Sequence, residues 1–252
     1  MLTLALKQAA CGLFFFVVCA GIANAGTIGV SPVRVTLSDS QKIDSFSVRN
    51  DGTEPITMQM EVLSWSQREG NAVFAATREL LANPPIFTIP AGSSQLVRVG
   101  LRRAPDVQRE LSYRIILEEL PPPPDPDSSG SGSGSGASMT LRISLPVFVS
   151  PEIDTKPVLL WQAVRTSQGA LKISLSNNGN THIQIKNFKL SLLDSEQPWV
   201  TLQTADYVLA GQSRDWIVLA NPENPAPPPG VTLKLFAQTD AGDIEAEVII
   251  AP

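Results

Sequence analysis

The sequence predicts an all-β chain made of two β-sandwich domains. Apolar residues alternate with polar ones in short segments along most of the chain. Turn residues such as Asn50-Asp51-Gly52 and Pro90-Ala91-Gly92 separate these segments. The strongest helical pattern is the weak candidate Ala75–Leu81. Short strands in close succession with turns between them are typical of sandwich folds.

The first 25 residues have the pattern of an export signal. Lys7 supplies a positive start, Cys11–Ala20 is almost entirely apolar, and Ala23-Asn24-Ala25 fits a cleavage site. We therefore predict a signal peptide over residues 1–25 and a mature chain that begins at Gly26. Both cysteines of the chain lie in this signal, so the mature protein is expected to be held together by its cores without disulfides.

The net charge of the mature chain limits the kinds of partner that it can bind. Removal of the signal takes away one of the 19 basic residues and none of the 24 acidic ones, so the mature net charge is −6. This balance argues against a generally basic nucleic-acid-binding protein. No later stretch is apolar and long enough to span a membrane, so the mature protein is not expected to cross one.

Residues 26–150 are predicted to form the first domain. Seven short strands in about 120 residues indicate an immunoglobulin-like sandwich. A loop over residues 121–138 precedes the last strand, and its Pro, Gly and Ser content predicts disorder over residues 123–137. The predicted strands are Ile28–Leu37, Ile43–Val48, Ile56–Trp65, Ile86–Ile89, Gln95–Leu101, Ser112–Leu120 and Met139–Val149.

Residues 151–157 contain two prolines and predict a short, stiff hinge. A second series of strands follows and predicts a smaller sandwich over residues 158–252. Its strands are expected at Val158–Arg165, Ala170–Ser176, His182–Leu193, Ala205–Leu209, Arg214–Leu219, Val231–Gln238 and Ile244–Ile250.

The strand Met139–Val149 carries the main functional prediction. Pro146 cannot donate a backbone hydrogen bond, which is typical of a strand at the edge of a sheet. An exposed apolar edge favours pairing with another chain, and we predict that such pairing is the function. The alternative is an ordinary core strand that follows a variable loop. The apolar residues on one face of the strand are Met139, Leu141, Ile143, Leu145 and Val147.

Few residues suit catalysis or metal binding. The only histidine, His182, lies beside the turn Asn177–Asn180, where its pattern predicts a solvent-facing strand residue. A catalytic histidine would need a nucleophile within reach, and a zinc site would need several Cys or His ligands. No Gly-Lys pair is present for a phosphate-binding loop. We expect no enzymatic activity, no catalytic residues, no metal and no cofactor.

Two sequence blocks occur in order in the first half, Asn83-Pro84-Pro85-Ile86-Phe87-Thr88-Ile89-Pro90-Ala91-Gly92 and Ser112–Pro121. With Val33-Arg34-Val35 and Leu141–Pro151, they resemble the PapD-like periplasmic chaperones of the chaperone–usher pilus pathway. The resemblance covers about residues 27–151 and is weak in the second half. It implies an L-shaped pair of immunoglobulin-like domains, in which Met139–Val149 completes the open sandwich of a pilin by donor-strand complementation.

The resemblance also implies partners and site residues. The partners would be pilus subunits (pilins) and an outer-membrane usher, in the periplasm of a Gram-negative bacterium. Leu141, Ile143 and Leu145 would enter the pilin groove, flanked by Met139 and Val147.

The resemblance carries Arg34 to the position that anchors the pilin's C-terminal carboxylate. Pro146 stands where the family has a lysine, so the chain looks more like the alternative or archaic branch. The second cation would then come from Arg98 or Arg114, since Arg142 lies nearer the start of the strand.

A secreted structural or adhesive β protein, either pilin-like or carbohydrate-binding, is the alternative function. A pilin should lack one strand and carry a free N-terminal donor segment, whereas this chain begins a strand at Ile28. A sugar-binding module should expose aromatic side chains, but the four tryptophans are scattered and predicted to pack in cores or at domain edges. A hydrolase on the same scaffold is the third possibility, which esterase and glycosidase assays would detect.

Overall fold

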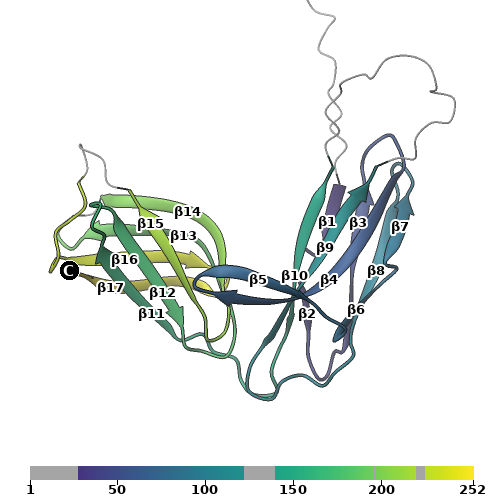
Figure 1. Ribbon diagram of the computed structural model, residues 1–252, viewed down its shortest axis with the longest axis horizontal. Helices are drawn as coiled ribbons and strands as arrows, with labels where there is room; N and C mark the ends of the chain where they lie inside the picture. Colours follow the sequence, from purple (N-terminus) through teal and green to yellow (C-terminus); the bar gives the residue numbers. More distant parts are fainter. Residues whose placement is uncertain (1–27, 122–139, 196, 220–224) are drawn as a thin grey trace, which may run out of the picture.

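The computed structural model describes residues 28–121, 140–195, 197–219 and 225–252. All the regular secondary structure in these ranges is β-strand, which confirms the predicted all-β class. The strands form two β-sandwiches that meet at one end and diverge at the other, as in an L (Figure 1). The predicted signal peptide, the predicted disordered segment 123–137 and Met139 lie outside the described residues.

The first sandwich packs two sheets against each other. One is four-stranded with the order β1-β3-β8-β6, and the other has the order β2-β10-β9-β4-β5, with β7 also paired to β4. The strands are β1 (Ile28–Ser31), β2 (Val35–Leu37), β3 (Ile43–Asn50), β4 (Ile56–Arg68), β5 (Asn71–Ala76), β6 (Leu80–Asn83), β7 (Ile86–Ile89), β8 (Ser94–Leu101), β9 (Leu111–Leu120) and β10 (Arg142–Val149).

The predicted first strand Ile28–Leu37 is in fact two strands in different sheets. β1 pairs with β3 in one sheet, whereas β2 pairs in parallel with β10 in the other. The chain crosses between the sheets at Pro32-Val33-Arg34, where the proline cannot continue a ladder. This crossing places Arg34 immediately before β2, at the rim of the sheet that carries β10.

β4 runs past its predicted end at Trp65, and it forms a hairpin with β5, a strand that was not predicted, which reaches the second sandwich (Figure 1). At its tip, the carbonyl oxygen of Gly70 accepts a 2.6 Å hydrogen bond from Arg214 Nη1. The weak helical candidate Ala75–Leu81 is wrong, because β5 ends at Ala76 and β6 begins at Leu80.

The second sandwich has seven strands in the order β14-β13-β16-β17-β11-β12-β15. Its core is built around Trp161, Phe188 and Trp216, and the two tryptophan rings stack with centroids 5.9 Å apart. The strands are β11 (Leu159–Arg165), β12 (Leu171–Asn177), β13 (Ile183–Leu192), β14 (Pro198–Val208), β15 (Ser213–Val218), β16 (Thr232–Thr239) and β17 (Gly242–Ala251).

Each sandwich has a corner built on a buried asparagine, which is Asn50 in the first sandwich and Asn177 in the second. Each side-chain nitrogen donates to the carbonyl oxygen four residues later. Each side-chain oxygen accepts from the N–H of a glycine two residues later, Gly52 or Gly179. Because a buried amide is stable only when its polar atoms are bonded, the same local sequence produces the same corner twice.

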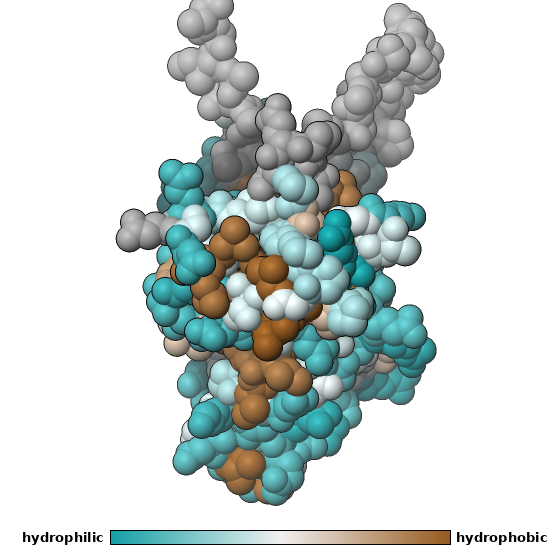
Figure 2. Space-filling model, turned by 90° about the vertical axis from the view of Figure 1, so that its left-hand side faces the viewer, coloured by the Kyte–Doolittle hydropathy of each residue, from teal (hydrophilic) through white to brown (hydrophobic). Residues whose placement is uncertain are grey.

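Apolar side chains gather on the end of the molecule that the second sandwich forms (Figure 2). Surfaces of this kind often mark sites of interaction. The large apolar residues of this sandwich that are exposed by 40–81% are Val158, Leu160, Leu192, Leu193, Ile217, Leu219 and Ile249.

Candidate functional site

Strand β10 has an open edge over residues Arg142–Pro146. β9 pairs with β10 along the whole of Arg142–Val149, but β2 covers the other side only from Val147 to Val149. Among the described residues, no strand pairs with the remaining side of Arg142–Pro146. The prediction of an edge at Pro146 is therefore confirmed.

The backbone hydrogen bonds show which groups face this open edge. The carbonyl oxygen of Leu141 accepts from the N–H of Glu119 on the β9 side, and the N–H of Ser150 donates to Leu37 on the β2 side. Successive residues of a strand direct their backbone groups to alternate sides. Arg142 and Ser144 therefore point their N–H groups to the open edge. Pro146 occupies the next such position, and it has no N–H to leave unpaired.

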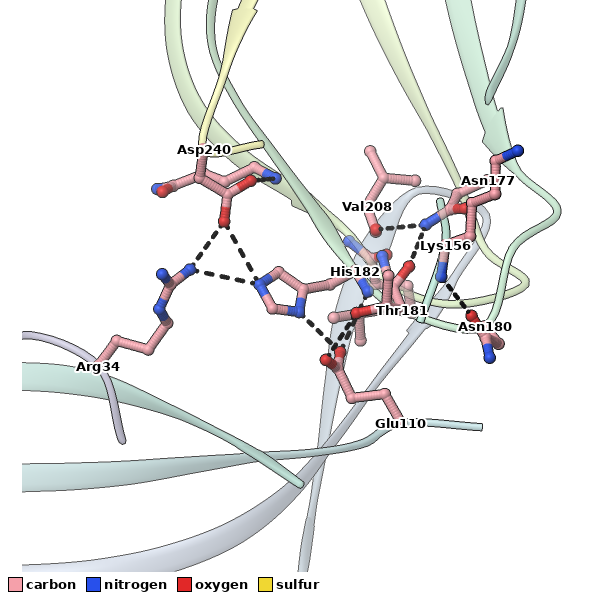
Figure 3. A network of polar contacts seen from close by, with 12 residues as sticks. Arg34, Glu110, Lys156, Asn177, Asn180, Thr181, His182, Val208 and Asp240 are labelled. Carbon is pink, nitrogen blue, oxygen red and sulfur yellow. Dashed lines mark hydrogen bonds and ion pairs between the residues drawn. The ribbon is translucent and has the colours of Figure 1, made fainter. Parts of the chain in front are cut away.

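Arg34 lies where the open edge ends. Val35 is in register with Val147, so Arg34 comes level with Pro146. The Arg34 side chain is 41% exposed, and its Nη1 donates a 2.7 Å hydrogen bond to Asp240 Oδ2 of the second sandwich (Figure 3). The guanidinium group is thus tethered at one nitrogen and partly open to solvent.

His182 lies between carboxylates from both sandwiches (Figure 3). Its Nδ1 is 2.7 Å from Glu110 Oε1, and its Nε2 is 3.5 Å from Asp240 Oδ2. Glu110, which is 7% exposed, also accepts from the backbone N–H of His182 and from the Thr181 hydroxyl. The prediction that His182 faces solvent is wrong: its side chain is 11% exposed, because the first sandwich covers it.

The charges of this cluster stabilise one another. Burial lowers the pKa of His182, but hydrogen bonds and charges from Asp240 and Glu110 outweigh this and raise it above 6.5. Burial raises the pKa of Asp240, but bonds from His182, the Gln184 N–H and Arg34 outweigh this and hold it well below 3.8.

Arg114 is a second cation at the interface between the sandwiches. Its Cζ lies 3.8 Å from the centroid of the Trp65 ring and 5.4 Å from that of Tyr207, which are cation–π distances. Its Nε is buried without a hydrogen-bond partner, and no carboxylate of the described residues lies within ion-pair distance. Burial lowers the pKa of this guanidinium. Aromatic faces hold Arg114, while its charge is left without an anion.

The structure brings only two of the three predicted anchor arginines together at this interface. Arg114 Cζ lies 5.4 Å from the centroid of the Tyr207 ring, and Arg34 contacts His182, whose ring centroid is 5.7 Å from that of Tyr207. Arg98 lies on β8, in register with Ser45 and Asn83, and it points away from the core on the outer face of the other sheet. The outer faces of a sandwich point in opposite directions, so the prediction that Arg98 belongs to this site is wrong.

The predicted donor residues also divide into two groups. Leu145 and Val147 are 2% and 0% exposed and belong to the core of the first sandwich, so the prediction that they enter a partner's groove is wrong. Leu141 and Ile143 are partly exposed, and Ile143 packs at the margin of that core. Met139 lies outside the described residues.

Sequence reasoning missed Glu110, Asp240 and Tyr207 as members of the site. Each is an isolated residue near a turn or strand end and has a partner on the other sandwich, so no local pattern marks it. The one available signal was that His182 is the only histidine of the chain.

In the parts of the chain that the structure describes, no group of three His, Cys, Asp or Glu side chains is arranged to hold a metal ion. Nor does any helix there have the length and apolarity needed to cross a membrane.

Several solved structures of pilus chaperones have the same fold. A chain from the complex of CsuC with the tip adhesion subunit CsuE, of the archaic chaperone–usher Csu pili of Acinetobacter baumannii, is 21% identical. The match covers 90% of this chain and 100% of that chain, with a TM-score of 0.65. The SafA pilin–SafB chaperone complex of Salmonella enterica gives 14% identity, coverage of 89% and 96%, and a TM-score of 0.58. The CupB2 chaperone of Pseudomonas aeruginosa gives 12% identity, coverage of 88% and 100%, and a TM-score of 0.56.

These identities establish a shared fold, and the comparison with sequence families establishes the family. A search of curated proteins found no match. The family model described as the PapD N-terminal domain of pili and flagellar-assembly chaperones matches residues 27–153, just over half of the chain. The chain therefore belongs to the PapD-like family of pilus-assembly chaperones.

Proposed function

We propose that this protein is a periplasmic chaperone that binds pilus subunits by donor-strand complementation and passes them to an outer-membrane usher. The observation that carries the proposal is the open edge of β10 over Arg142–Pro146, which ends at Arg34. Complexes with a tip adhesion subunit and with a pilin, seen for CsuC and SafB, support a subunit as the partner.

β2 indicates in which direction a bound strand would run along β10. A strand added to the open edge of β10 would lie in line with β2, which runs parallel to β10. If the added strand runs the same way, its C-terminus arrives at Arg34. A guanidinium can bind a chain-end carboxylate through two parallel hydrogen bonds, and the unpaired charge of Arg114 adds attraction. The carboxylate would then fix the register of the subunit along the edge.

The apolar side chains available for subunit binding lie at the start of β10. Leu141 and Ile143 are partly exposed, and Met139 shares their parity, so these three would fill the subunit's groove. Complete burial of such a side chain stabilises a complex by about 1.5–3 kcal/mol before the cost of ordering. Leu145 and Val147 instead hold β10 in its own sandwich.

The carbohydrate-binding alternative loses its support. Trp65, Trp161 and Trp216 are 6–8% exposed and pack in aromatic clusters, and the partly buried Trp199 packs against the core of the second sandwich. Buried tryptophans offer no platform for a sugar ring. We also propose that export depends on residues 1–25 and that the mature chaperone acts without catalysis.

Recovery of a pilin from the periplasm tests the function. We expect a pilin encoded beside this gene to accumulate with the wild-type chaperone and to be lost with Leu141→Asp. Thr140→Asp, one residue away and of opposite parity, is the matched control and should retain the pilin. Equal recovery with Leu141→Asp and with the wild type would contradict donation by β10.

A further inference from the structure

His182 connects the two sandwiches at the point where a subunit's carboxylate would arrive. Its Nε2 is 3.5 Å from Arg34 Nη1 as well as from Asp240 Oδ2 (Figure 3). Glu110 holds its other ring nitrogen at 2.7 Å. The His182 ring therefore lies between Glu110 of the first sandwich and Asp240, the residue that holds Arg34.

The proton of His182 decides the charge of this cluster. Arg34, Arg114, Glu110 and Asp240 contribute two positive and two negative charges around Tyr207 and His182. Protonated His182 makes the sum positive by one charge, which a single carboxylate would balance. Neutral His182 leaves no excess charge, so a bound carboxylate would make the cluster negative in a partly desolvated place.

Protonation also changes what holds Arg34. Neutral His182 that donates from Nδ1 to Glu110 presents an Nε2 lone pair, which can accept from Arg34 Nη1. Protonated His182 instead donates from Nε2 to Asp240, the same carboxylate that Arg34 uses. Asp240 then shares its negative charge between His182 and Arg34. A second anion, such as the carboxylate of a subunit, would therefore stabilise Arg34 more than it does when His182 is neutral.

We propose that His182 is a positioning residue of the carboxylate site, which acts on Arg34 through Asp240 and supplies the charge that balances a bound subunit carboxylate. The inference rests on the proposed function and deepens it. It predicts that carboxylate capture weakens as pH rises and His182 loses its proton. By linkage, a bound carboxylate must in turn raise the proton affinity of His182.

The electrostatic environment agrees with this role. The pKa of His182 is raised above 6.5 despite burial, so the ring keeps its proton at a higher pH than a free histidine does. The groups that face it are the carboxylates of Glu110 and Asp240, the cation of Arg34, and the rings of Phe148 and Tyr207. The raising influence of the two acids exceeds the effect of burial.

Nuclear magnetic resonance can follow His182 without ambiguity, because the chain has no other histidine. The probes are N-acetylglycinate, which ends in a carboxylate like a peptide chain, and N-acetylglycinamide, its neutral counterpart. We expect N-acetylglycinate to raise the pKa of His182 and N-acetylglycinamide to leave it unchanged. Binding of N-acetylglycinate should weaken roughly five- to tenfold between about pH 6 and about pH 8.5, the range of a typical coupling.

Variants separate positioning from a general structural role. His182→Phe keeps a ring against Phe148 but removes the charge, and it should abolish the pH dependence of N-acetylglycinate binding. Asp240→Asn should lower the pKa of His182 and so move the pH dependence of N-acetylglycinate binding to lower pH. Gln67→Ala is the control: Gln67 also bridges the sandwiches, but it bonds only the backbone of Tyr207 and Leu209 and none of the charged groups around His182, so both readouts should stay at wild-type values.

The outcomes distinguish this inference from the proposed function. If N-acetylglycinate perturbs the Nε–H signal of Arg114 but does not move the pKa of His182, the inference is overturned and the carboxylate site remains. If neither signal responds, the carboxylate site itself is refuted, and the inference with it. A loss of pH dependence in Gln67→Ala equal to that in His182→Phe would also overturn the inference, since any interdomain contact would then suffice.

Discussion

The imidazole ring of His182 lies flat against the phenyl ring of Phe148, with ring centroids 3.6 Å apart and ring planes 8° apart. Phe148 belongs to β10, and His182 belongs to the turn that precedes β13 in the second sandwich. The end of β10 is therefore packed directly on the charged cluster that tethers Arg34. This contact joins the second sandwich to the strand that carries the open edge, next to the proposed carboxylate site.

Replacement of Arg34 should weaken subunit binding without unfolding the chaperone. Removal of one partner of a desolvated charge pair costs about 2–5 kcal/mol, and the partial exposure of Arg34 favours the low end, about thirtyfold in affinity. Calorimetry with a pilin C-terminal peptide measures this change for Arg34→Ala. Arg98→Ala, on the opposite outer face, is the control that should bind normally. Equal losses in the two variants would show that overall charge, rather than an anchor, governs binding.

Truncations along β10 should separate stability from binding. Leu145→Ala empties part of a well-packed core and should lower the free energy of unfolding by about 2–5 kcal/mol. Leu141→Ala removes a partly exposed side chain, so it should change stability little and reduce subunit binding. Urea unfolding and peptide binding measure the two effects. A stable Leu145→Ala variant that binds no subunit would restore Leu145 to the donor set.

Stability should depend on pH in two separate windows. Because the pKa of folded His182 is raised, its contribution is complete below pH 6.5 and is lost as pH rises through the folded pKa. Because the pKa of folded Asp240 is lowered, its contribution is complete above pH 3.8 and is lost as pH falls through the folded pKa. Urea unfolding at a series of pH values should show both declines. His182→Phe should remove the loss of stability at the higher pH. If that loss is unchanged in the variant, a group other than His182 causes it.

Gln67 should contribute to the joint between the sandwiches. Its Nε2 donates to the carbonyl oxygen of Tyr207 at 2.7 Å, and its Oε1 accepts from the N–H of Leu209 at 2.9 Å. Gln67→Ala should cost about 1–3 kcal/mol, since each hydrogen bond contributes about 0.5–1.5 kcal/mol. Gln67→Glu keeps the acceptor, so the Leu209 amide should stay protected from hydrogen exchange in that variant only. Protection of Leu209 in both variants would mean that another group bonds this amide.

Export should remove residues 1–25. N-terminal sequencing of the periplasmic protein should begin at Gly26, because Ala23-Asn24-Ala25 fits the cleavage site. A periplasmic form that still contains Cys11 would contradict this assignment.

The sequence predicted most strands because their apolar residues alternate and turn residues separate them. The prediction failed where a strand has no alternation of buried and exposed residues, or where the alternation continues through a change of sheet. Every residue of β5, Asn71–Ala76, is exposed, so no buried face marks it as a strand. The split of Ile28–Leu37 into β1 and β2 was missed because a strand that changes sheets keeps its parity.

The site was predictable in part for related reasons. Pro146 indicated an edge, and the family motif placed Arg34. The period of two gave the face of Leu145 and Val147 but not the depth of the core beneath them, which depends on the opposite sheet. The buried position of His182 could not be predicted, because Glu110 is 72 residues away and the bond forms only when the two sandwiches meet.

Amide hydrogen exchange of β10 tests the central claim most directly. In the free protein, the N–H groups of Arg142 and Ser144 face the open edge and should exchange fast, whereas those of Ile143 and Leu145 point to β9 and should be protected. With a pilin bound, we predict that Arg142 and Ser144 become protected while Ile143 and Leu145 stay so. A pilin that binds and leaves Arg142 and Ser144 exchanging as fast as before would contradict donation of this edge.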